Sequence, residues 1–145
     1  MAEIDAHISE GALDVTAALG SGSSPESGAV AAFIGTVRQT AAVPENDAKN
    51  VVGLEYEAHP TLDLARIREI ANEAAEKWDL KKVIAVHRSG ACDLGEPTVV
   101  VVTSAPHRGD ALESCRWLID TIKAGVPIWK KEHYADGSSW VGAEH

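Results

Sequence analysis

Residues 98–125, TVVVVTSAPHRGDALESCRWLIDTIKAG, carry the strongest indication of the fold. The run of valines at its start is typical of a central strand. Asp110 is followed three residues later by Glu113, a capping-box pattern that predicts the start of a long helix. This helix is expected to run to about Lys123 and to end at Gly125. The stretch therefore predicts a buried strand that leads, through a short polar connection, into a helix.

The other expected elements alternate between strands and helices. Residues 29–38, AVAAFIGTVR, predict a strand that is buried on both sides, and the alternation in residues 52–58 predicts a half-buried strand. Apolar residues spaced by three and four over residues 64–78 predict a second long helix. Strands and helices that interleave in this way predict the α+β class. The shorter expected elements are a helix at residues 12–19 and strands at 82–88, 129–134 and 138–141.

The 145 residues are expected to form one domain, residues 1–145, without an internal repeat. Residues 39–50, QTAAVPENDAKN, lack periodicity and contain Pro44, so this segment is expected to be a mobile loop. The two cysteines, Cys92 and Cys115, do not suggest a disulfide framework, and both are expected to be structural.

Charge, apolar runs and histidine spacing together argue against several classes of partner. The chain has 13 Lys+Arg against 22 Asp+Glu and a formal net charge of −9, which argues against general nucleic-acid binding. No apolar run approaches the roughly 20 residues of a membrane helix, and the N-terminus lacks the features of a signal peptide. The six histidines show no metal-ligand spacing. We therefore expect a cytoplasmic protein with no metal, no nucleic-acid partner and no membrane partner.

Basic residues gather at the ends of the expected elements. Arg38 ends a strand, His107 and Arg108 follow the central strand, and Lys123 and Lys130 lie on the two sides of a helix stop. Side chains at such ends converge on pockets while the scaffold stays rigid. The pattern predicts a pocket for a small, multiply anionic ligand, with a lysine available for proton transfer or covalent chemistry.

Plainer interpretations of these residues remain open. Lys123 also suits the negative end of a helix dipole, and Lys130 and Lys131 also suit a solvated edge strand. Arg38 and the two basic residues after the central strand are also compatible with ordinary surface positions. Trp129 is expected to fill the core rather than to stack against a ligand.

A set of motifs in a fixed order points to a known family. The motifs are GAVAAFIGTVR, LEYEAHP, VIAVHRSG, VTSAPHRGDALESCRWLIDTIKAGVPIWKKE and a closing Trp-Val pair. Together they span most of the chain, from about residue 8 to residue 141, and residues 104–132 are the most specific part. In these motifs the chain resembles the large, catalytic subunits of molybdopterin synthases, the MoaE family.

The resemblance implies an α/β hammerhead-type core with a mixed or antiparallel sheet and two long helices. It implies a sulfurtransferase of molybdenum cofactor biosynthesis, which converts cyclic pyranopterin monophosphate (precursor Z) to molybdopterin by adding two sulfur atoms. The sulfur arrives as a thiocarboxylate on the C-terminal Gly-Gly tail of a small, ubiquitin-like subunit of the MoaD type. A homodimer within a heterotetramer is implied, with no cofactor beyond the pterin substrate.

The resemblance also implies roles for individual residues. Lys123 matches the main acid/base or a transient covalent partner of the tail, and Lys130 matches a second lysine that assists it. His107 and Arg108 match an anion-binding pair that the family contributes across the dimer interface. The full set of implied substrate-binding residues is Thr36, Val37, Arg38, His107, Arg108, Lys131 and Glu132.

Two other functions are compatible with a basic pocket. One is a non-catalytic module that docks the tail of a ubiquitin-like protein, which would not require both lysines. The other is a phosphoesterase, although the sequence offers no metal ligands or evident nucleophile for it. Ser138 and Ser139 stand where many relatives carry an arginine, so no anion contact is expected from that position.

Overall fold

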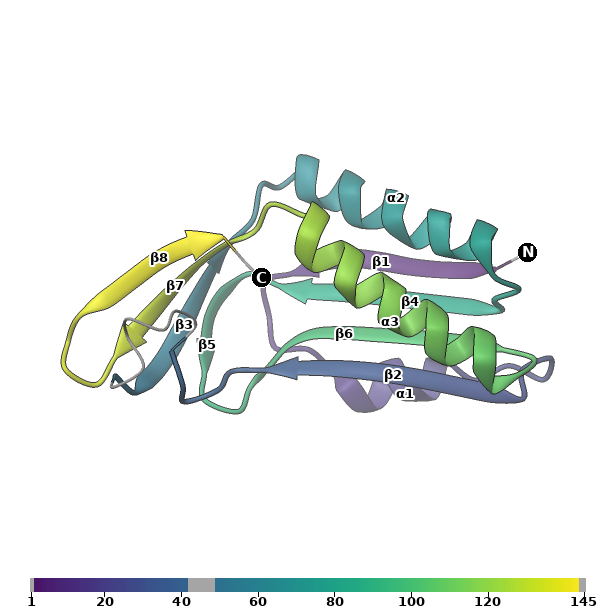
Figure 1. Cartoon of the computed structure of the whole chain (residues 1–145), viewed down its shortest axis with the longest axis horizontal. Coiled ribbons are helices and arrows are strands. Elements are labelled where there is room, and N and C mark those ends of the chain that lie inside the picture. The colour runs from purple at the N-terminus through teal and green to yellow at the C-terminus, as the bar shows by residue number, and fades with distance from the viewer. Residues whose placement is uncertain (1, 42–48, 144–145) are drawn as a thin grey trace.

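The computed structural model describes residues 2–41 and 49–143, which form three helices and eight strands in two sheets (Figure 1). This is the α+β class that the sequence predicts. The elements, in chain order, are β1 (Glu3–Ser9), α1 (Val15–Ser21), β2 (Ala29–Thr36), β3 (Val51–Glu57), α2 (Leu62–Lys77), β4 (Lys82–Arg88), β5 (Gly90–Asp93), β6 (Pro97–Ala105), α3 (Arg108–Gly125), β7 (Trp129–Tyr134) and β8 (Ser139–Ala143).

The first sheet has the strand order β1-β4-β6-β2. Strand β1 runs parallel to β4, and the other neighbours are antiparallel. Strand β6 contains the run of valines and is buried along almost its whole length. The predicted central strand is therefore confirmed. Valines suit this position because residues with a β-branched side chain pack well on both faces of a covered sheet.

The two long helices cover one face of the first sheet, and the short helix α1 packs against β6 on the other face (Figure 1). Ile67 and Ile70 of α2 and Leu118 and Ile122 of α3 are at most 1% exposed. Successive residues of β6 point alternately to the two faces, so Val99 and Val101 join the large core while Val100 and Val102 join a smaller cluster under α1.

The second sheet has the order β5-β3-β7-β8 and extends from one end of the first (Figure 1). Its inner face is buried, with Leu54 and Tyr56 on β3 opposite Glu132 and Lys130 on β7. Residues 39–50, which are expected to form a mobile loop, directly precede β3. Thr40 and Asn50 form an isolated bridge at the base of this segment, and residues 42–48 lie outside the described residues.

Arg88, the last residue of β4, connects the two sheets. Its guanidinium donates hydrogen bonds to the carbonyl oxygens of Glu10 (2.6 Å), Ser89 (2.8 Å) and Ala91 (2.8 Å). It also pairs with the carboxylate of Glu96 at 3.2 Å. The side chain of Arg88 is buried, so these partners compensate for the loss of its hydration.

Two sequence expectations about the elements are wrong. Strand β2 is not buried on both sides, because it is the last strand of its sheet, and Val30 is 46% and Phe33 37% exposed. Helix α3 begins at Arg108 with His107 as its N-cap, so Asp110 lies in the first turn rather than at the cap. A carboxylate there still interacts favourably with the helix dipole. Strands β1 and β5 were not among the expected elements.

Candidate active site

A cavity of about 350 Å³ lies where the end of β2, strands β3 and β7 and the last turn of α3 meet. Three cationic side chains line it, Arg38, Lys123 and Lys130, together with the carboxylate of Glu132. A concave site with excess positive charge suits a small anionic ligand. The other lining residues are Phe33, Ile34, Gly35, Thr36, Leu54, Tyr56 and Thr98.

The end of α3 brings the two lysines to this cavity. Lys123 lies in the last turn of the helix, and the chain then leaves the helix at Val126, whose amide donates to the carbonyl oxygen of Ile122 at 2.9 Å. Ile128 follows and is almost completely buried, which anchors the connection. Strand β7 begins at the next residue, so Lys130 is on its inward face and is only 9% exposed.

The end of β2 supplies Thr36 and Arg38. The pairing of β2 with β6 shifts register between Gly35 and Thr36, which turns the chain toward the second sheet. Val37 lies between the two lining residues, but its side chain is buried in the core and does not line the cavity. Its amide donates to the carbonyl oxygen of Glu96 at 3.1 Å and so fixes the strand end.

Glu132 is the acidic member of the cavity. It is 3% exposed and lies two residues after Lys130 on the same inward face of β7. The hydroxyl of Tyr134 donates a hydrogen bond to Glu132 Oε1 at 2.9 Å. A buried carboxylate needs such donors and nearby cations, because burial without them costs several kcal/mol.

His107 and Arg108 lie at the opposite end of α3 from the cavity. Arg108 is the first residue of the helix and Lys123 is fifteen residues later, which corresponds to about 22 Å along the helix axis. Both His107 and Arg108 are exposed. The single chain therefore does not bring this pair to the lysines.

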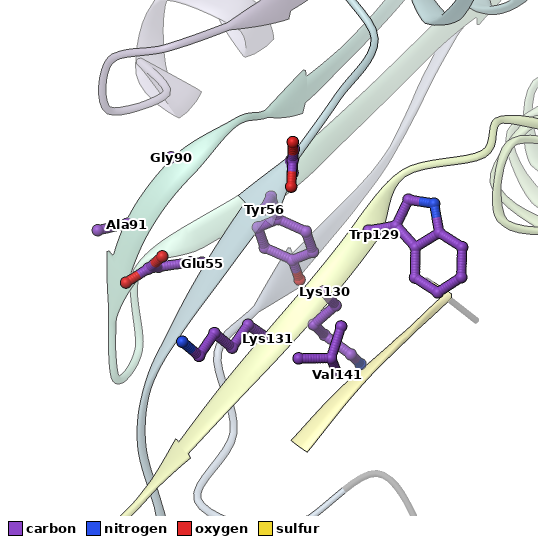
Figure 2. Close-up of a pocket in the computed structure, with 9 residues that line it drawn as sticks. Glu55, Tyr56, Gly90, Ala91, Trp129, Lys130, Lys131 and Val141 are labelled. Carbon is purple, nitrogen blue, oxygen red and sulfur yellow. The ribbon is translucent and has the colours of Figure 1, made fainter. Parts of the chain in front are cut away.

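A second cavity, of about 470 Å³, lies on the outer face of the second sheet (Figure 2). Lys131 lines this second cavity, together with Trp129 and Val141, and does not line the first cavity. Trp129 is 54% exposed, so the expectation that it fills the core is wrong. Strand alternation explains the difference, because Ile128 occupies the core and Trp129 then begins an outward-facing row.

Sequence reasoning missed several residues of the first cavity. Tyr56 is opposite Lys130 in the pairing of β3 with β7, and Thr98 begins the buried part of β6. The alternation of residues 52–58 indicates that Tyr56 and Leu54 share a face. It does not indicate which strand lies next to them, because strand pairing is a long-range property of the fold.

Neither cysteine lines this cavity. Both are free and buried, as expected for structural cysteines. Burial raises the pKa of the Cys92 thiol to about 12, with a further contribution from its interaction with Glu96. Burial alone raises the pKa of the Cys115 thiol to about 11. Both groups are therefore neutral thiols at physiological pH and poor nucleophiles.

The described residues contain no group of three or more His, Cys, Asp or Glu side chains arranged to hold a metal ion. Among the helices of residues 2–41 and 49–143, none has the length and apolar character needed to cross a membrane.

Comparisons with known proteins identify relatives that match most of this chain. The family described as "MoaE protein" matches residues 8–125, a range that includes Lys123 and ends before Lys130. The molybdopterin synthase catalytic subunit of Halalkalibacterium halodurans is 41% identical over 118 residues, which are 81% of this chain and 72% of that protein. The human protein of the same name is 38% identical over 119 residues, which are 82% of this chain and 61% of that protein.

A solved structure agrees with these sequence relatives. The crystal structure of molybdopterin synthase from Staphylococcus aureus superposes with a TM-score of 0.81 and 31% sequence identity, covering 93% of this chain and 94% of that chain. The family match covers most of the sequence, and the shared fold extends beyond it to residues near both ends. The chain therefore belongs to the MoaE protein family.

Proposed function

We propose that this chain is the catalytic subunit of a molybdopterin synthase. In this reaction, two sulfur atoms from the C-terminal thiocarboxylate of a small, ubiquitin-like carrier of the MoaD type convert cyclic pyranopterin monophosphate to molybdopterin. The observation that carries the proposal is the cavity that Lys123 of α3, Lys130 of β7 and Arg38, two residues after the end of β2, line together. The family membership of the chain supports the same function.

The cavity matches the electrostatic demands of this reaction. A thiocarboxylate and a phosphate are both anions, and bringing them together in water-excluded surroundings is costly unless cations compensate. Arg38 offers a planar fork that fits phosphate oxygens, and the two lysines offer compact charges that also donate protons. We assign Arg38 and Thr36 to substrate binding, and Lys123 to acid/base chemistry or a transient bond with the tail, assisted by Lys130.

Each sulfur transfer forms a carbon–sulfur bond to the side chain of the pterin and breaks a carbon–oxygen bond at the same carbon, which opens the cyclic phosphate at one carbon and releases water at the other. Water then cleaves the bond between that sulfur and the acyl carbon of the tail, so the carrier leaves with an ordinary carboxylate. The cysteines are not needed for this route, because Cys92 and Cys115 are buried and neutral and lie outside the cavity. Sulfur is handed over from carrier to substrate directly, without a persulfide on this chain and without a resident cofactor.

A second copy of the chain would complete the site. His107 and Arg108 lie at the Ala29 end of β2, because the amide of Gly28 donates to the carbonyl oxygen of Ala105 at 3.0 Å. The lysine cavity lies at the Thr36 end of the same strand. Antiparallel pairing of two β2 strands about a two-fold axis would bring the His107–Arg108 pair of one copy toward the cavity of the other.

The surface around β2 is suited to such a dimer. Strand β2 is the last strand of the first sheet, and it leaves Val30 46% and Phe33 37% exposed. Leu112, on the helix that packs beside β2, is 60% exposed. An exposed edge strand with apolar side chains is a ready surface for self-association. We propose a cytoplasmic homodimer that binds two carrier subunits in a heterotetramer.

Reconstitution with defined components tests the proposed function. Purified chain, thiocarboxylated carrier and cyclic pyranopterin monophosphate are expected to yield molybdopterin, whereas a carrier that ends in an ordinary carboxylate is expected to yield none. A stable complex that gives no product would instead favour a docking module. Opening of the cyclic phosphate without any carrier would favour a phosphoesterase.

A further inference from the structure

Tyr134 lies just outside the residues that line the proposed active site, and its hydroxyl is hydrogen-bonded to one of them. It is the last residue of β7 and is 3% exposed. Its hydroxyl donates to Glu132 Oε1 at 2.9 Å, and Glu132 lines the cavity together with Lys123 and Lys130. Tyr134 does not itself line that cavity. The hydrogen bond to the Glu132 carboxylate is therefore a route by which Tyr134 can affect the chemistry.

The inward row of β7 explains this contact. Residues at every second position of a strand point to the same face, so Lys130, Glu132 and Tyr134 follow one another on the buried side of the sheet. A glutamate side chain has three rotatable bonds, and a carboxylate that has one oxygen fixed has far fewer orientations. The hydrogen bond from the tyrosine hydroxyl thus restricts the orientation of the carboxylate beside the two lysines.

The tyrosine is itself held by the turn between β7 and β8. Its amide donates to the carbonyl oxygen of Ser138 at 2.9 Å, and its carbonyl accepts from the amide of Gly137 at 3.0 Å. Gly137 has a φ of 87°, a conformation that glycine adopts readily. The ammonium of Lys49 lies 5.3 Å from the centre of the tyrosine ring. Backbone and ring are thus restrained by residues that do not line the cavity.

We propose that Tyr134 is a positioning residue for the sulfur-transfer reaction, which orients the Glu132 carboxylate toward the lysine pair. The proposal rests on the proposed function for its effect on turnover. Its structural part does not, because the orientation of Glu132 and the environment of the two lysines are properties of the chain alone.

The first test is a double-mutant cycle. Tyr134→Phe removes the hydroxyl and keeps the ring, and it is expected to lower kcat roughly tenfold or more while KM for the carrier stays within about twofold. In a Glu132→Gln background the same substitution is expected to change kcat by less than about twofold, because its target is already altered. Effects that multiply in the double variant would overturn the proposal, as would a wild-type kcat for Tyr134→Phe.

Lys49→Met is the matched control. It removes the cation over the tyrosine ring and leaves the hydroxyl in place, so kcat is expected to remain within about twofold of the wild-type value. An equal loss in Lys49→Met and Tyr134→Phe would show that the surroundings of the ring, and not the hydroxyl bond to Glu132, control turnover.

The second test is independent of synthase activity. The rates of reductive methylation of individual lysines, followed by mass spectrometry, report the environment of each ammonium group. Tyr134→Phe is expected to change the rates at Lys123 and Lys130 by roughly threefold or more and to leave the surface residue Lys81 unchanged. Unchanged rates at both cavity lysines would overturn the proposal even if the wild-type chain makes no molybdopterin. A failure of the proposed function would instead appear as the absence of product with wild type.

Discussion

Lys123 and Lys130 line the same cavity, although Lys123 belongs to the last turn of α3 and Lys130 to the strand that follows it. The break between these elements is short, and Val126 and Ile128 anchor it in the core. A continuous helix would place the two lysines seven residues apart on one exposed face. Because the helix ends between them, the two lysines lie in one concave site rather than on an exposed helix surface.

Replacement of Lys123 by alanine is expected to lower the rate of molybdopterin formation at least about a hundredfold, because a positioned acid/base group contributes on this scale. Complex formation with the carrier is expected to persist. Rapid-quench assays with thiocarboxylated carrier, together with size-exclusion chromatography, measure both properties. Arg116→Ala, on the exposed face of the same helix, is the control and should leave the rate unchanged. Full activity of Lys123→Ala with an intact fold would exclude the proposed role.

A mixture of two inactive variants is expected to recover activity if the site is shared between two copies. Lys123→Ala disrupts the cavity, and Arg108→Ala disrupts the distant end of α3. In a randomly mixed population of dimers, roughly a quarter of all sites combine two intact contributions, so about a quarter of the wild-type activity should return. Subunit exchange after brief unfolding and refolding provides the mixture. If mass spectrometry detects mixed dimers but no activity returns, Lys123 and Arg108 either act in a site built by one copy of the chain or lie outside the active site.

The thiols of Cys92 and Cys115 are expected to make the free energy of unfolding depend on alkaline pH. Their folded pKa values of about 12 and about 11 lie above the ordinary value of 9.0. Above pH 9.0 the unfolded chain releases protons that the folded chain retains, so stability falls as pH rises and is fully present below that value. Urea unfolding between about pH 8 and about pH 11 measures the slope. A Cys92→Ala, Cys115→Ala double variant should show a clearly smaller slope, and an identical slope would assign the effect to other groups.

Loss of the Arg88 side chain is expected to destabilise the fold by about 3–5 kcal/mol, because Arg88→Leu leaves Glu96 and three carbonyl oxygens without their buried donor. Chemical denaturation measures the change. Arg116→Ala breaks an exposed ion pair with Asp120 and should cost less than about 1 kcal/mol. Similar small values for the two variants would mean that Arg88 is not the link that holds the sheets together.

Local patterns predicted most of the elements of this chain. The valine run of β6, the apolar stripe of α2, and the glycine at the end of α3 with the proline that follows are each signals that extend over a few residues. Such signals depend on the side-chain spacing along one element and need no knowledge of its neighbours. Helix starts were less well predicted, since His107 rather than Asp110 precedes α3, and a polar connection offers several competing cap residues.

The family and the residue types of the candidate site were evident from the sequence alone. The ordered motifs indicated which lysines and arginines to consider, and Arg38, Lys123, Lys130 and Glu132 do line one cavity. Composition also excluded a general nucleic-acid binder, because net charge requires no structure to evaluate.

The folded structure was needed to show which of these residues meet and which side of a sheet they face. It placed Trp129 on the outer face, left β2 at an exposed edge, separated Arg108 from Lys123 by the length of a helix, and brought the Tyr134 hydroxyl to Glu132. These features depend on strand order and register, which come from contacts between segments far apart in the chain. A shift of one residue in a strand reverses the direction of every side chain, and the local sequence does not reveal it.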